Sequence, residues 1–156
     1  MIKNYYYLIT GILSILFSFT HAWNGEVTIL PYLDIDMIAI ETRTIISYVW
    51  HVISAENLLF GIAFLYMAFS KDLPKVRFAA LVIALIIIVR WMVIFSVTLL
   101  YSPSRVKDIL IDSIAIVIYI SLIVLGIRNK SFFSKVKDNT TSKKSIPKRP
   151  MESMSD

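Results

Sequence analysis

The sequence contains no cysteine among its 156 residues. This absence excludes disulfides, thiolate metal ligands and thiol redox chemistry, and it leaves the cellular compartment open. Histidine is also scarce, with two residues, and only four glycines and five prolines are present to interrupt helices. The net charge of +5 does not indicate nucleic-acid binding, because the basic residues lie between and beyond long apolar segments.

Apolar residues dominate instead. They make up 57% of the chain, whereas soluble domains contain about 45–50%, and the mean hydropathy is +0.71. Four runs approach the roughly 20 residues that cross about 30 Å of hydrocarbon; they cover 5–22, 45–69, 78–101 and 109–127. The sequence therefore predicts an all-α membrane protein with an antiparallel bundle of four transmembrane helices over 1–128. A basic tail, predicted to be disordered, follows over 129–156.

The first run has a second interpretation, as a cleaved signal peptide. Lys3 would then form the basic n-region, and Thr20-His21-Ala22 the small-residue cleavage site. Against this, the apolar stretch is longer than the about 7–15 residues of a signal-peptide core. It also carries a helical polar stripe, which a discarded segment does not need. We therefore predict that the first helix is retained.

Lys and Arg are unequally divided between the two sides of the predicted bundle. If the N-terminus is cytoplasmic, twelve of the sixteen lie on that side, three lie outside and Arg90 lies within the membrane. By the positive-inside rule, both termini are predicted to face the cytoplasm of a bacterium, with the chain in its cytoplasmic membrane. The outer loop 23–42 is predicted to lie along the membrane surface or over the bundle mouth.

The predicted partners follow from this topology. The lipid bilayer is the first, and its anionic headgroups would attract the basic tail. A membrane-protein partner or a second copy of the chain is the other. No nucleic-acid partner is expected.

Two of the apolar runs carry polar or small residues at steps of three and four, which place them on one helix face. Small and hydroxylated residues allow membrane helices to approach closely, so the two stripes are predicted to face each other. The stripes consist of Tyr7, Thr10, Gly11, Ser14, Ser18 and His21 in the first run and Ser47, Trp50, Ser54, Asn57 and Gly61 in the second.

The two histidines are expected at similar depths near the outer face. A bend at Asn24-Gly25 would return the Glu26 carboxylate towards His21 and His51. Two imidazoles and a carboxylate suit Zn²⁺ or another divalent metal. Two facing imidazoles also suit haem, the less favoured cofactor. The structural alternative is that each histidine hydrogen-bonds a neighbouring helix or a lipid headgroup.

Three further charged residues fall inside the predicted helices. Glu56 and Arg90 both lie near mid-membrane, where an unpaired charge costs about 2.5–3.5 kcal/mol, so they are predicted to form an ion pair. Such a pair either only locks two helices together or forms part of an ion, proton or substrate path. Asp112 lies one turn below Asp108 on the same face of the fourth helix. It is the candidate to orient an imidazole, whereas the helix dipole alone explains Asp108.

The first half of the chain resembles a family of small bacterial multi-pass membrane proteins. The resemblance is carried by a His-x-x-x-Gly-Glu element from His21 to Glu26, by Thr42-Arg43, and by a Trp-His pair in the second helix. It covers residues 8–65, while the last two helices match only in length and hydropathy. It implies that five residues act as one constellation and names no substrate; the five are His21, Gly25, Glu26, Trp50 and His51.

Three hypotheses for function follow. The leading one is an outward-facing pocket for a metal ion or small ligand, whose members are His21, Glu26, His51 and Asp112 as the site, Glu56 and Arg90 as its floor, and Asn24, Gly25, Trp50, Ser54 and Asn57 as supporting residues. The second is a non-catalytic accessory or structural subunit of a membrane complex. The third is an enzyme acting on a lipid-borne substrate with His51 as general base, although no nucleophile or phosphate cradle is visible.

Overall fold

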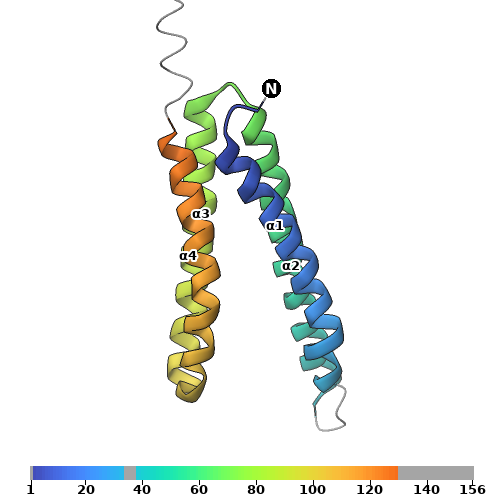
Figure 1. The fold of residues 1–156 in the computed structure, drawn as a ribbon. Coiled ribbons are helices and arrows are strands. Elements are labelled where there is room, and N and C mark those ends of the chain that lie inside the picture. The colour runs from blue at the N-terminus through green and yellow to red at the C-terminus, as the bar shows by residue number, and fades with distance from the viewer. Residues whose placement is uncertain (1, 34–37, 130–156) are drawn as a thin grey trace, which may run out of the picture.

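The computed structural model describes residues 2–33 and 38–129, and these are almost entirely helical (Figure 1). The elements in chain order are α1 (Tyr5–Asn24), the π-helix η1 (Gly25–Ile29), the 3₁₀ helix η2 (Leu30–Leu33), α2 (Ile40–Phe69), α3 (Leu73–Tyr101), the 3₁₀ helix η3 (Pro103–Arg105) and α4 (Val106–Arg128). The described residues contain no strand. The predicted tail lies outside them except for Asn129.

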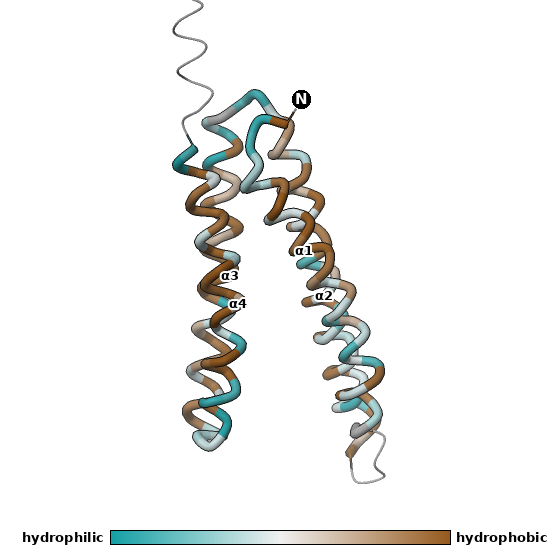
Figure 2. The backbone as a smooth tube through the Cα atoms, in the orientation of Figure 1, coloured by the Kyte–Doolittle hydropathy of each residue, from teal (hydrophilic) through white to brown (hydrophobic). Residues whose placement is uncertain are grey.

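Four helices are long and apolar enough to cross a membrane, as the hydropathy predicts. Hydrophobic residues occur along all four helices, with more pale and hydrophilic residues between them on α1 and α2 than on α3 and α4 (Figure 2). α2, α3 and α4 begin three to five residues before the corresponding apolar runs because their first turns are polar, whereas α1 and its run both begin at Tyr5. In α3, for example, the Asp72 side chain caps the helix by accepting from the backbone N–H of Lys75, and Pro74 occupies the first turn. The side-chain hydrogen bond from Lys75 lowers the pKa of the Asp72 carboxyl.

The helices are arranged as two hairpins, α1 with α2 and α3 with α4, and consecutive helices run in opposite directions (Figure 1). The start of α1, the connection 70–72 and the end of α4 lie together, and we call this the terminal end. The opposite end, which holds η1, η2 and η3, is the loop end. The hairpins meet at the terminal end and diverge towards the loop end (Figure 1).

At the terminal end, residues at the start of α1 contact both α2 of their own hairpin and α4 of the other. The Asn4 side chain donates from Nδ2 to the Gly126 carbonyl at 2.8 Å, and the backbone N–H of Lys3 donates to the Ala68 carbonyl at 2.8 Å. A Cβ on Gly126 would lie 2.3 Å from the Tyr7 ring, so only glycine admits that ring. The start of α1 is thus bound to both α2 and α4. The buried apolar residues are Tyr7, Phe64, Met67, Ala68, Val76, Ala80, Ile83, Ala84, Ile87 and Ile123.

The polar stripes predicted on the first two helices do face each other. Ser14 donates from its hydroxyl to the Asn57 carbonyl at 2.7 Å. A Cβ on Gly61 would lie 2.5 Å from Cγ1 of Ile15, so the glycine lets the two backbones approach closely. Hydroxyl groups bonded to the facing helix are a recurrent means of joining membrane helices. The α1–α2 hairpin is therefore a closely packed unit.

Candidate functional site

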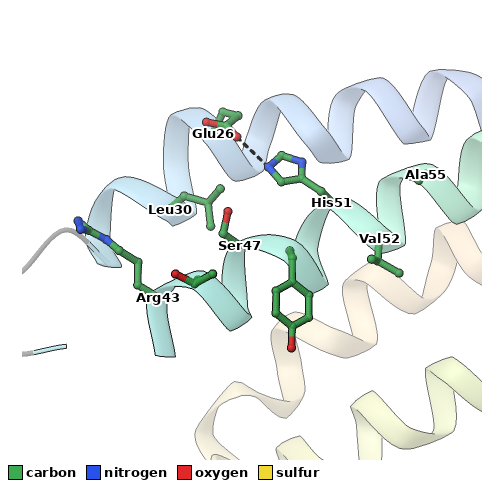
Figure 3. A pocket seen from close by; sticks show the side chains of 9 residues that line it. Glu26, Leu30, Arg43, Ser47, His51, Val52 and Ala55 are labelled. Carbon is green, nitrogen blue, oxygen red and sulfur yellow. Dashed lines mark ion pairs between the residues drawn. The ribbon is translucent and has the colours of Figure 1, made fainter. Parts of the chain in front are cut away.

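The expected bend at Asn24-Gly25 does not form. Gly25 keeps a right-handed helical backbone, with φ −57° and ψ −56°, and the chain continues into η1. A π-helix holds more residues per turn than an α-helix and is frequent at functional sites. Oε1 of Glu26, on this turn, lies 2.8 Å from Nε2 of His51 on α2 (Figure 3). The glutamate reaches the histidine because the helix continues, and no reversal of the chain is needed.

Trp50 joins the other members of the predicted constellation. Its indole donates from Nε1 to the His21 carbonyl at 2.9 Å and stacks on the His21 imidazole, with ring centroids 4.4 Å apart and planes at 13°. The indole also covers Gly25, where an added Cβ would lie 2.1 Å from Nε1. Gly25 is therefore required by the close approach of the Trp50 ring. With the Glu26–His51 pair on neighbouring turns, all five residues lie at the loop end of the α1–α2 hairpin.

His21 is used in helix packing. Its Nδ1 lies 3.0 Å from the hydroxyl oxygen of Ser54, and one face of its ring lies against Trp50. The Ser54 carbonyl in turn accepts from the Ser18 hydroxyl at 2.6 Å. His21 thus follows the structural alternative considered for it, a hydrogen bond to the neighbouring helix.

The predicted metal site of His21, Glu26, His51 and Asp112 does not form. All four residues are described, and within the described part of the chain no group of three or more His, Asp or Glu residues is placed to hold a metal ion. His21 is directed to Ser54, and Asp112 is exposed on α4, on the other hairpin, without a hydrogen bond or ion pair to either histidine. The four residues therefore do not form one metal site.

Glu26 and His51 line a pocket of about 750 Å³ between η1, η2 and the first half of α2 (Figure 3). Their side chains are 61% and 43% exposed. The complete lining is Glu26, Leu30, Arg43, Thr44, Ser47, Tyr48, His51, Val52 and Ala55. Sequence reasoning missed Thr44 and Tyr48, although steps of three and four along α2 place them on the same side as His51. The pocket combines a carboxylate, a guanidinium, an imidazole and hydroxyl groups with apolar walls, a composition typical of small-molecule sites.

Glu56 and Arg90, which the sequence predicts to pair, meet between α2 and α3. Nη1 of Arg90 donates to Oε2 of Glu56 at 2.8 Å, and Nη2 donates to Oδ1 of Asn57 at 3.1 Å. The guanidinium thus bridges the two hairpins near the middle of their helices. Neither Glu56 nor Arg90 lines the pocket, so they do not form its floor.

Comparison of the chain with protein-family models, curated proteins and solved structures finds no match. The resemblance to a small bacterial membrane-protein family therefore stays a prediction.

Proposed function

We propose that the chain is a multi-pass protein of a bacterial cytoplasmic membrane, with its four helices forming an antiparallel bundle, both termini inside and the loop end outside. The charge distribution supports this orientation. The terminal end and the tail carry twelve Lys and Arg residues, whereas the loop end carries three beside several carboxylates. The pocket would then open at the outer membrane face.

We further propose that this pocket binds a small polar ligand. The observation that carries the proposal is the Glu26–His51 contact of 2.8 Å in the pocket wall. A half-exposed ion pair contributes only about 0–1 kcal/mol to stability, so the fold has little need of it. The fold nevertheless positions the pair closely, by a π-turn after Gly25 and by the packing of Trp50.

The lining restricts the chemistry of the ligand. Glu26 accepts hydrogen bonds, whereas the Arg43 guanidinium in the same lining disfavours a cation, so the lining suits an uncharged ligand that bears a hydroxyl group. Ser47 supplies a further hydroxyl, while Val52 and Ala55 supply an apolar surface. A small amphiphilic molecule that carries at least one hydrogen-bond donor fits this lining best.

One observation favours the accessory-subunit hypothesis as a second candidate. One of the two histidines, His21, contacts Trp50 and Ser54 and therefore serves helix packing. If the chain is only an accessory subunit, the His51 side chain is also expected to hold helices together and to bind no ligand. The enzyme hypothesis has less support, because among the described residues no side-chain hydroxyl forms a hydrogen bond with His51.

The two histidines provide a matched test of the proposal. We expect His51→Gln to weaken ligand retention about 10- to 100-fold, the loss expected for a hydrogen bond to a charged group, with little change in thermal stability. We expect His21→Gln to retain the ligand and to lower thermal stability, because it removes the stack on Trp50. The measurement is native mass spectrometry of the full chain released gently from its membrane, together with a melting curve of each variant.

The same sample tests the cofactor hypotheses. We expect elemental analysis to find no stoichiometric metal and the visible spectrum to show no haem band. A small-molecule adduct retained equally by the wild type and by His51→Gln would contradict the pocket proposal. Absence of any adduct from the wild type would favour the accessory subunit.

A further inference from the structure

The pocket at the loop end lies at the level where the hydrocarbon of a membrane would end. About 20 helical residues cross the hydrocarbon, and α1, which is 20 residues long, ends at Asn24. Counting the same number of residues back from Phe69, the last residue of α2, reaches Trp50. Glu26 lies just beyond the first of these positions and His51 beside the second, and their side chains meet at 2.8 Å. The Glu26–His51 pair therefore marks the boundary of the hydrocarbon on the side of the loop end.

Exposed aromatic side chains support this placement. Trp23 and Tyr48 are exposed at the level of the pocket, and Tyr5 and Tyr66 are exposed at the terminal end. Tryptophan and tyrosine concentrate at the two interfaces of a membrane, because their rings are apolar over most of their surface and polar at one edge. These four side chains therefore delimit the hydrocarbon at the same two levels as the residue count.

The lining of the pocket changes from polar to apolar across this boundary. Its polar members on the headgroup side are Glu26, Arg43, Thr44 and Ser47. On the hydrocarbon side the lining ends in Val52 and Ala55. Steps of four and three along α2 continue the same face to Leu59 and Ile62. Val52, Leu59 and Ile62 are 61%, 65% and 53% exposed, so the pocket continues into an apolar face that is open to the bilayer.

Charges and hydrogen-bonding groups restrict the polar part of a ligand in this pocket. Glu26 and Arg43 carry opposite charges in one lining, so a headgroup with a net charge of either sign meets a like charge. The contact with His51 uses Oε1 of Glu26, and Oε2 can accept a further hydrogen bond. The Ser47 hydroxyl forms no hydrogen bond with any residue that the structure describes. A hydroxyl group on the ligand can donate to the carboxylate and accept from the serine.

We propose that the pocket binds an uncharged membrane lipid with a hydroxylated headgroup, of which diacylglycerol is the simplest example. The hydroxyl lies between Glu26 and Ser47, and one acyl chain follows Val52 and Ala55 along α2 into the bilayer. The inference rests on the ligand pocket proposed above and names the class of its ligand. A water-soluble ligand would contact only the headgroup side of the lining.

Ala55→Trp tests the proposal, because it fills the hydrocarbon end of the pocket and keeps every polar member of the lining. The probe is a diacylglycerol with a photoreactive diazirine on one acyl chain, placed with the full chain in phosphatidylcholine nanodiscs. We expect saturable labelling of the wild type at the pocket-lining part of α2. Excess unlabelled diacylglycerol should prevent this labelling, and glycerol should not.

We expect Ala55→Trp to weaken the saturable labelling about tenfold, a loss within the range for an overpacked contact. The matched control is Ala115→Trp, which makes the same replacement at an exposed alanine of α4 that does not line the pocket. This control should be labelled like the wild type. Both alanines are exposed, so both variants should keep the fold, and their melting curves check this.

Two outcomes of this experiment would overturn the inference. The first is equal saturable labelling of Ala55→Trp and Ala115→Trp, which would place the lipid outside the pocket. The second is stronger competition by phosphatidylglycerol or phosphatidylethanolamine than by diacylglycerol, which would mean that the pocket selects a charged headgroup.

Native mass spectrometry separates this inference from the function on which it rests. An adduct that has the mass of a diacylglycerol or a related uncharged lipid and is lost in His51→Gln supports both. An adduct that is lost in His51→Gln but has the mass of a water-soluble molecule would overturn the lipid and leave the ligand pocket standing. If the wild type shows neither an adduct nor saturable labelling, both proposals are wrong.

Discussion

Replacing Glu56 with alanine is expected to lower the free energy of unfolding by about 3–5 kcal/mol, because Arg90 is left charged and without its carboxylate in a low-dielectric region. Arg90→Ala is expected to have an effect of similar size, since it leaves Glu56 charged and without its partner and also removes the donor to Asn57. The side chains are less than one third exposed, so water compensates little for the lost partner. Chemical or thermal unfolding of the full chain in detergent micelles measures both losses.

The double replacement Glu56→Leu with Arg90→Leu distinguishes an interacting pair from two residues that stabilise the fold independently. We expect it to recover much of the lost stability, because no unpaired charge remains. Glu41→Ala, at the exposed first turn of α2, is the control and should change stability little. If the double variant loses as much free energy of unfolding as the two single variants combined, the two residues do not interact.

Replacing Gly25 with alanine is expected to cost about 1–3 kcal/mol, the range for an overpacked contact. The new Cβ would lie 2.1 Å from Nε1 of Trp50, so the indole has to leave its place. Its hydrogen bond to the His21 carbonyl and its stack on the His21 ring are then lost together. A melting curve measures the stability, and tryptophan fluorescence reports the exposure of the ring.

Two variants control this prediction. Asn24→Ala changes the exposed neighbour and should be nearly neutral. In a Trp50→Phe background, Gly25→Ala should cost less than in the wild type, because the phenyl ring lacks the part of the indole that the Cβ meets. An equal cost in both backgrounds would mean that Gly25 matters for a reason other than Trp50.

The features that the sequence predicts best depend on periodicity and depth. Hydropathy within single segments identifies the four spans, and steps of three and four identify the faces by which α1 and α2 meet. Glu56 and Arg90 can be paired because each lies near the middle of its span, which leaves few partners within reach. None of these features depends on the conformation of individual side chains.

The parts that the sequence did not predict depend on contacts between side chains. Nothing local to His21 shows that its ring stacks on Trp50 instead of turning towards His51. Asp112 is at a suitable depth, but the hairpins diverge at the loop end, and helix order alone does not predict that divergence (Figure 1).

The central claim is that a pocket with His51 in its wall opens on the outside of the cell, and the lack of native cysteine makes it directly measurable. A single cysteine in place of His51, treated in intact cells with a membrane-impermeant maleimide, should be labelled. Lys71→Cys, in the connection at the terminal end, and Ser54→Cys, in the α1–α2 contact, should not be. Labelling of Lys71→Cys with none of His51→Cys until the membrane is permeabilised would contradict the orientation, and a His51→Cys that stays unreactive after permeabilisation would contradict the open pocket.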